Sequence, residues 1–272
     1  MQNRMTLRNT LCGWILAVSL VSGCATTVDS RSVDNDGLYS AITVDDVGYI
    51  RAAVSSGAVN PNQRISAPGY GAGAPLITLA ARAGSVAVLQ YLIGAGANLN
   101  ARSPYDETAL MLACFFMSDL EGQGASYELH EAAARILVDA GASLEASRDA
   151  YTPLSYAAYQ GRDRTIRFLL ARGARVDGYV EDGVTYLPTP LMMATMMGHE
   201  DAARLLLKAG ANARLRVEAG NTAFELARKY RQTQLFSMLR CAERLPPGQK
   251  FSRWCAGATA TDSLIPAGLF RR

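Results

Sequence analysis

The sequence predicts an all-α solenoid, a stack of helix-turn-helix units. Two repeating patterns carry this prediction. A seven-residue segment that starts with Thr or Pro and is rich in Leu, Met and Ala begins at residues 75, 108, 152, 189 and 222, so successive starts are 33, 44, 37 and 33 residues apart. A Gly-Ala pair follows four of these starts, at residues 96, 141, 173 and 210. Units of this size cannot bury their apolar faces singly, and stacking them gives one continuous core.

Residues 1–23 are expected to be an export signal. A basic start precedes an apolar run over residues 11–21, which is too short to span a bilayer. The segment Val21-Ser22-Gly23-Cys24 resembles the lipobox of bacterial lipoproteins, in which the cysteine is acylated and becomes the first residue after cleavage. This resemblance implies a lipid anchor at Cys24, and Ala25 after it favours the outer membrane, with the protein facing the periplasm. An ordinary signal peptide and an uncleaved anchor are the alternatives.

Residues 24–35 are expected to form a tether and residues 36–240 the repeat domain, which starts with an atypical unit ending at Gly57-Ala58. Within each clear unit, the opening Thr can cap the first helix, and a Pro after it loses no hydrogen bond. Leucines such as Leu169 and Leu206 supply the apolar stripe of the second helix, and the Gly after that stripe can adopt the left-handed conformation that ends a helix.

These units resemble the ankyrin repeat. The strongest matches run from Thr152-Pro153-Leu154 to Gly173-Ala174, and from Thr189-Pro190-Leu191 through Gly198-His199 to Gly210-Ala211-Asn212. Two departures are that Pro75-Leu76 stands where Thr-Pro is usual, and that the last unit lacks the Gly-Ala pair. The resemblance implies about six helix-turn-helix units joined by short hairpin fingers. It also implies that the fingers and first helices line a concave face on which partner proteins dock.

Residues 241–272 are expected to form a tail that caps the last unit. In an oxidising periplasm Cys241 and Cys255 are a natural disulfide pair, and two free thiols are the alternative. Cys114 lies within a helical apolar pattern and is expected to be a small buried residue. The tail also contains apolar residues suited to a cap, namely Trp254, Leu264, Ile265, Leu269 and Phe270.

Tyrosines recur in the connecting fingers and are the candidate partner-binding residues, because tyrosine joins a large contact area to a polar tip. The alternative is that each tyrosine packs on its neighbouring finger. Three connections are also longer than the period requires: the Pro- and Gly-rich 60–74, about 116–129, with 12 extra residues, and 177–188, with four. They are expected either to serve binding or to be neutral insertions. The tyrosines are Tyr70, Tyr105, Tyr151, Tyr179 and Tyr186. The methionines Met192, Met193, Met196 and Met197 are a second candidate for binding, although residues at this helical spacing are expected more often in the core.

Little in the sequence points to chemistry. The chain has 27 Lys and Arg against 24 Asp and Glu, so its near-neutral balance argues against nucleic-acid binding. His199 follows Gly198 at a tight turn and His130 precedes a second helix, and neither belongs to a catalytic or zinc motif. The segment 69–75 is glycine-rich, but no apolar strand leads into it. Adjacent carboxylates, Asp45-Asp46 and Glu181-Asp182, are expected on solvated faces.

We therefore expect no enzyme, cofactor, metal or small-molecule substrate, and a periplasmic scaffold that binds another protein. Membrane-tethered ankyrin lipoproteins resemble antitoxic partners of secreted lipases, which suggests an immunity protein that neutralises a toxic effector. An envelope assembly factor and a stress-defence accessory protein are the alternatives.

Overall fold

The computed structural model describes residues 33–115, 127–145, 150–217, 220–246, 249–251 and 255. The lipobox with Cys24, most of the insertion at 116–129 and the apolar tail residues after Phe251 lie outside the described residues. No helix in the described ranges is long and apolar enough to cross a membrane.

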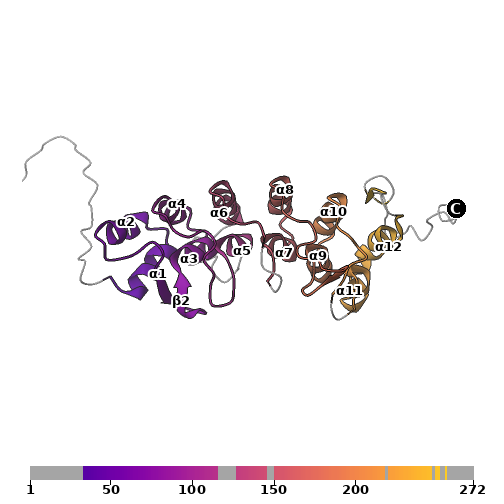
Figure 1. Cartoon of the computed structure of the whole chain (residues 1–272), viewed down its shortest axis with the longest axis horizontal. Helices are drawn as coiled ribbons and strands as arrows, with labels where there is room; N and C mark the ends of the chain where they lie inside the picture. The colour runs from indigo at the N-terminus through magenta and orange to yellow at the C-terminus, as the bar shows by residue number, and fades with distance from the viewer. Residues whose placement is uncertain are drawn as a thin grey trace, which may run out of the picture.

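The described helices form pairs that stack in a row, the first helix of each pair in one layer and the second in another (Figure 1). The first helices are α1 (Asn35–Thr43), α3 (Leu76–Ala83), α5 (Ala109–Cys114), α7 (Pro153–Tyr159), α9 (Pro190–Met197) and α11 (Ala223–Lys229). The second helices are α2 (Val47–Ser55), α4 (Val86–Gly94), α6 (Tyr127–Asp139), α8 (Asp163–Ala171), α10 (Glu200–Lys208) and α12 (Phe236–Arg244), and the short turn η2 (Thr233–Leu235) precedes α12.

Short strands lie in the fingers between pairs. Strands β1 (Arg64–Ala67) and β2 (Gly71–Pro75) form an antiparallel hairpin, and β3 (Val184–Thr185) pairs in parallel with β4 (Arg216–Val217) of the next finger. The sequence did not predict strand β1 before residues 69–75, where only the absence of an apolar strand was expected. Strand β1 alternates exposed and buried residues, so it contains no continuous apolar run that the sequence could reveal.

Threonine caps set the starts of the first helices, as predicted. In α7 the Thr152 hydroxyl accepts a hydrogen bond from the Ser155 N–H, and Pro153 follows at the first helical position. Thr108, Thr189 and Thr222 cap α5, α9 and α11 in the same way. Pro75 has no side chain that could do this for α3.

The core runs the length of the solenoid. Leu169 in α8 and Leu206 in α10 are fully buried, and the small Ala157 and Ala158 are buried where helices approach closely. One cluster of buried apolar residues extends from Leu38 to Cys255. The stripe predicted from the repeats is thus a continuous elongated core.

A second set of contacts joins consecutive units. Near the start of a second helix, a polar side chain donates a hydrogen bond to a backbone carbonyl at the end of the previous unit's first helix, where carbonyls lack partners within the helix. His130 makes one of these contacts from within α6, so the expectation that it precedes the helix is wrong. The pairs are Ser85 with Ile42, His130 Nε2 with Arg82 (2.9 Å), His199 Nε2 with Tyr159 (3.0 Å) and Gln232 Nε2 with Met196 (3.1 Å).

The turn between the two helices of a unit needs a left-handed residue. Gly84, Gly161 and Gly198 occupy it with φ of 70°, 65° and 76°. A Cβ on Gly161 would also lie 2.7 Å from the imidazole ring of His199. The first unit has Asp45 there, with φ of 55°, and its carboxylate accepts hydrogen bonds from the backbone N–H groups of Ala87 and Val88 at the start of α4.

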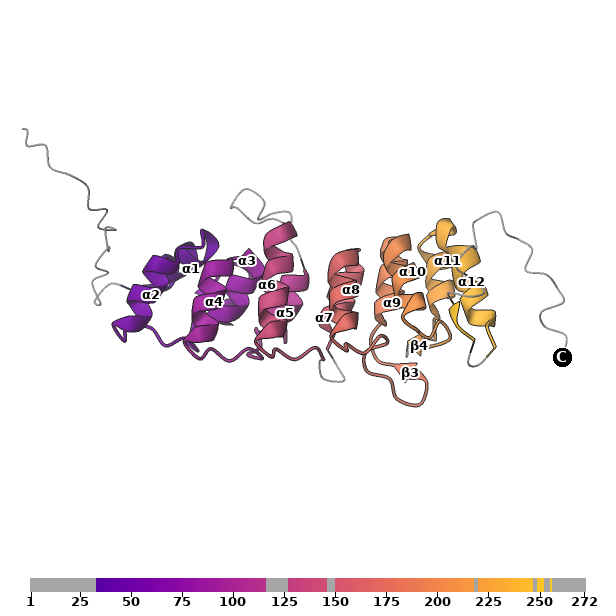
Figure 2. The ribbon, with the colours of Figure 1, turned by 90° about the horizontal axis from the view of Figure 1, so that it is seen from above.

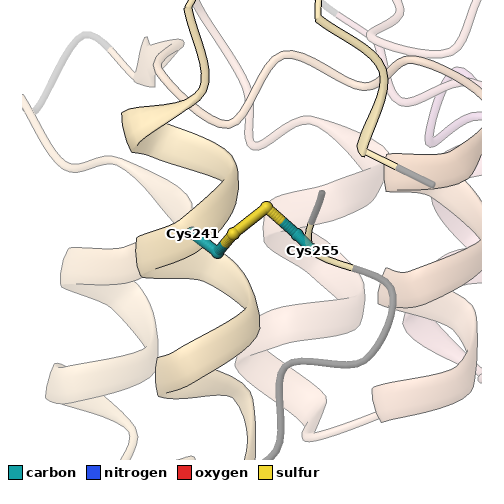
Figure 3. Close-up of a disulfide and its surroundings, with 2 residues drawn as sticks. All are labelled: Cys241 and Cys255. Atoms are coloured by element: carbon teal, nitrogen blue, oxygen red, sulfur yellow. A yellow bond between two sulfur atoms is a disulfide. The ribbon is translucent and has the colours of Figure 1, made fainter. Parts of the chain in front are cut away.

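The last helix is longer than expected. Helix α12 continues to Arg244, beyond the expected end of the repeat domain at residue 240, so Cys241 lies in a helix of the last unit and not in a tail. A disulfide joins Cys241 to Cys255, with Cα atoms 5.8 Å apart (Figure 3). Cys114 is a free, buried cysteine.

Candidate interaction surface

The fingers lie along one edge of the solenoid, and the finger that contains β3 projects beyond the others (Figure 2). Together with the first helices, they carry all five tyrosines that the sequence singles out. The structure places these tyrosines in three different settings.

The first setting is a network around Glu107. The hydroxyls of Tyr70 and Ser103 donate to Glu107 Oε2 at 3.2 and 3.1 Å, and the Tyr156 hydroxyl donates to Oε1 at 3.4 Å. Burial, then the negative charge of Glu107, raises the pKa of Tyr70 to about 12, and the same causes raise the pKa of Tyr156. The carboxylate thus ties together side chains from three consecutive units.

The structure corrects the prediction that Tyr70 is a partner-binding residue. Its side chain is only 6% exposed, and the Arg82 guanidinium lies over its ring, 4.8 Å from the centroid. It packs on neighbouring residues, which was the alternative interpretation. Tyr105 packs against it, with ring centroids 5.6 Å apart, and donates its hydroxyl hydrogen bond to Gly69 O at 2.8 Å. The Tyr105 side chain nevertheless remains 66% exposed.

The second setting is a hollow of about 20 Å³ between two fingers. Tyr151, Tyr179 and Asp177 line it, and Tyr151 also lies edge-on to Tyr156 at 6.2 Å between ring centroids. Burial raises the pKa of Tyr151. A space of this size holds at most about one water molecule, so it is a packing contact between fingers and not a ligand site.

The third setting is the projecting finger, residues 177–188. Its tip is a tight hairpin in which the N–H of Glu181 donates to Val184 O at 3.0 Å and the N–H of Val184 donates to Glu181 O at 2.9 Å. Asp182 and Gly183 between them have φ of 51° and 77°, as a primed two-residue turn requires. Thr185 is buried and pairs with the next finger through β3 and β4, which fixes the direction of the hairpin.

This hairpin exposes a cluster of apolar side chains, which we call the finger patch: Tyr179, Val180, Val184 and Tyr186. They are four of the eight large hydrophobic side chains that are exposed in the described part of the chain. Single exposed apolar residues are ordinary, whereas a cluster on one projecting element is typical of a contact surface. The sequence identified the two tyrosines but not the valines, and the Asp-Gly turn between Val180 and Val184 was the signal for a hairpin.

Asp177 lies at the base of this finger. Its carboxylate accepts hydrogen bonds from the N–H of Asn212 at 3.1 and 3.3 Å, which join the finger to the next one. Burial raises the pKa of Asp177 to about 6, although the Asn212 N–H opposes this shift. The ionised carboxylate of Asp177 therefore lowers the stability of the folded state.

Replacing Asp177 with Asn should stabilise the protein above pH 6. Because the pKa of Asp177 is raised in the folded state, its contribution to stability is present below pH 4 and is lost as the pH rises through about 6. The Asn side chain keeps an acceptor for Asn212 without the charge. We expect a gain of about 1–2 kcal/mol at pH 8 and none at pH 4, measured by urea unfolding. Asp182→Asn at the exposed tip is the control; equal gains in both variants would contradict the assignment.

The polar residues considered for chemistry have structural roles. Asp46 caps α2 and Asp45 contacts the start of α4, while both histidines bond to backbone carbonyls. Within the ranges that the structure describes, no three His, Cys, Asp or Glu side chains are arranged to hold a metal ion. What the described residues offer is a surface for contact.

Comparison with family models gives two matches. Residues 77–182 match the model described as ankyrin repeats (3 copies), and residues 189–216 match the single ankyrin repeat. A search of curated proteins found no match.

Proposed function

We propose that this chain captures its partner protein with the finger patch. The chain carries ankyrin repeats and folds as an all-α ankyrin solenoid, which is a scaffold for protein–protein interaction. The observation that carries this proposal is the exposed cluster of Tyr179, Val180, Val184 and Tyr186 on a hairpin that backbone pairing holds in place. A preformed apolar surface loses little conformational entropy on binding, and buried aromatic side chains often dominate the affinity of an interface.

We further propose that the scaffold works in the periplasm, held by a lipid at Cys24. The lipobox sequence supports this proposal. So does the pairing of Cys241 with Cys255, because disulfides persist in oxidising compartments. A binder tethered at the membrane can stop a toxic effector where it acts, so an immunity role is the specific form of the proposal. It rests on the resemblance to lipoproteins that neutralise secreted lipases.

A pull-down tests the finger patch. The bait is the protein from Ala25 onwards, which keeps every described residue, incubated with envelope and secretion fractions. We expect one major partner, with an affinity at least about tenfold lower for Tyr179→Ser/Val180→Ser/Tyr186→Ser. The control Val44→Ser/Tyr105→Ser alters the two large hydrophobic residues that are most exposed elsewhere among the described residues. Circular dichroism checks that all baits are folded.

Three results are informative. Loss of the partner from the finger variant alone supports the proposal, and equal capture by all baits refutes it. The identity of the partner then distinguishes the specific roles, because a secreted toxin supports immunity and a resident envelope protein contradicts it.

A further inference from the structure

The charge of the solenoid is strongly uneven along its length. Among the described residues, 33–145 contain five Lys and Arg against ten Asp and Glu, whereas 150–255 contain 15 against eight. The whole-chain net charge of +3 hides this contrast because the two halves largely cancel. The near-neutral total therefore conceals a basic C-terminal half and an acidic N-terminal half.

Within that half, one group of cations stands out, which we call the basic turn: Arg228, Lys229, Tyr230 and Arg231 at the end of α11. All four residues are exposed. The side chains of Arg228 and Arg231 make no hydrogen bond or ion pair with any residue that the structure describes. Other arginines are neutralised, for example Arg204 by Glu200 at 2.6 Å. The basic turn thus presents uncompensated positive charge.

The backbone of Arg231 is unusual. It occupies the turn position that is glycine in three other units, and its φ is 59°. A side chain in this left-handed conformation is strained. Asp45 at the same position compensates by bonding to the start of α4, but the Arg231 side chain has no such contact in the described structure. Glycine would adopt this left-handed conformation with less strain than arginine. An arginine kept there without a partner points to a role in binding and not in stability.

Apolar surface adjoins these charges. Met197 and Tyr230 are each 43% exposed and stand 33 residues apart, at the same position of two consecutive repeats. Because α9 packs against α11, the two side chains belong to neighbouring turns of the stack. An aromatic residue, a methionine and arginines together are typical of protein interfaces.

We propose that the basic turn, together with Met197, binds an acidic surface of the protein that the scaffold captures. This inference rests on the proposed function, since the protein that the basic turn binds is the one that the finger patch captures. The finger patch and the basic turn lie toward opposite ends of α9 and α11 (Figure 2). A compact partner lying across these helices reaches both. An extended polyanion such as DNA, or a flat anionic membrane, would also meet the acidic N-terminal half and be repelled by it.

Peptide binding tests the inference. The probe is a fluorescein-labelled peptide of alternating Glu and Leu, compared with the same peptide carrying Lys for Glu, with a DNA duplex and with phosphatidylglycerol vesicles. The protein from Ala25 onwards is compared with Arg228→Gln/Lys229→Gln/Arg231→Gly. The matched control, Arg164→Gln/Arg167→Gln/Lys208→Gln, removes the same charge from exposed positions of α8 and α10.

We expect the acidic peptide to bind wild type and control alike, more weakly as salt increases, and about tenfold or more weakly to the basic-turn variant. Arg231→Gly alone should unfold at a higher temperature than wild type, so loss of binding is not loss of fold. Equal peptide binding by both variants overturns the inference, as does absence of peptide binding to wild type. Tighter binding of DNA or vesicles than of the acidic peptide, lost in the basic-turn variant, overturns it in favour of that polyanion.

The same variants keep this inference separate from the proposed function. If the finger variant loses the natural partner but the basic-turn variant captures it as wild type does, only the further inference fails. If the acidic peptide still depends on the basic turn but the finger variant captures the partner normally, only the finger patch fails.

Discussion

Replacing Leu169 with Ala should lower the free energy of unfolding by about 2–5 kcal/mol. Leu169 is fully buried in α8, in the middle of the stack, and belongs to the continuous apolar core. Helix α8 packs against α6 and α10 of the units on either side. Truncation removes apolar contacts and leaves a cavity that helices packed on several sides cannot readily close. Urea unfolding followed by circular dichroism at 222 nm measures the change.

Arg167→Ala is the matched control for this experiment, because Arg167 is exposed on the same helix. We expect it to change stability by no more than about 0.5 kcal/mol. A loss below about 1 kcal/mol for Leu169→Ala would contradict a core that is continuous through this unit. A broad, multistep transition in the leucine variant alone would show that the two halves of the solenoid unfold separately.

Replacing both Cys241 and Cys255 with Ser should destabilise the protein by about 2–3 kcal/mol. The disulfide closes a loop with a sequence separation of 14, and its loss releases the unfolded chain from that constraint. Cys255 and Phe251 are both buried, so the disulfide also holds apolar side chains in the core at the end of the solenoid. Reductant should destabilise the wild-type protein by a similar amount and leave the double variant unchanged.

A thiol count provides the control. The protein from Ala25 onwards has three cysteines, so the oxidised form should show one reactive thiol after denaturation and the reduced form three. Burial raises the pKa of Cys114 to about 12, so this thiol should react only after unfolding. Cys114→Ala should leave the response to reductant intact. Three reactive thiols in denatured, unreduced protein from the periplasm would contradict the disulfide.

Part of the candidate surface could be predicted from sequence. The extra residues and tyrosines of the 177–188 connection identified it as a possible binding element, and the structure exposes Tyr179 and Tyr186 there. The valines were missed because two valines in a short connection form no pattern. Only the hairpin brings Val180 and Val184 to the same tip.

The basic turn illustrates a different limit. Its four residues can be read directly from the sequence, and alignment of the repeats shows that Arg231 occupies the position of a glycine in three other units. Whether a surface cation is available depends on whether a carboxylate lies within reach, and pairs such as Arg172 with Asp139 join residues 33 apart. Such contacts arise only when units stack.

The sequence by itself determined the solenoid, because a repeated cap, apolar stripe and terminating glycine give each unit the same local structure and leave a face that only a neighbour can cover. The tertiary structure alone decided which tyrosines face solvent. Tyr70 is buried because stacking brings it against Arg82 and Glu107, whereas Tyr186 sits on a hairpin that projects past its neighbours. The exposure of a finger residue depends on the adjoining fingers, and no pattern within a single repeat contains that information.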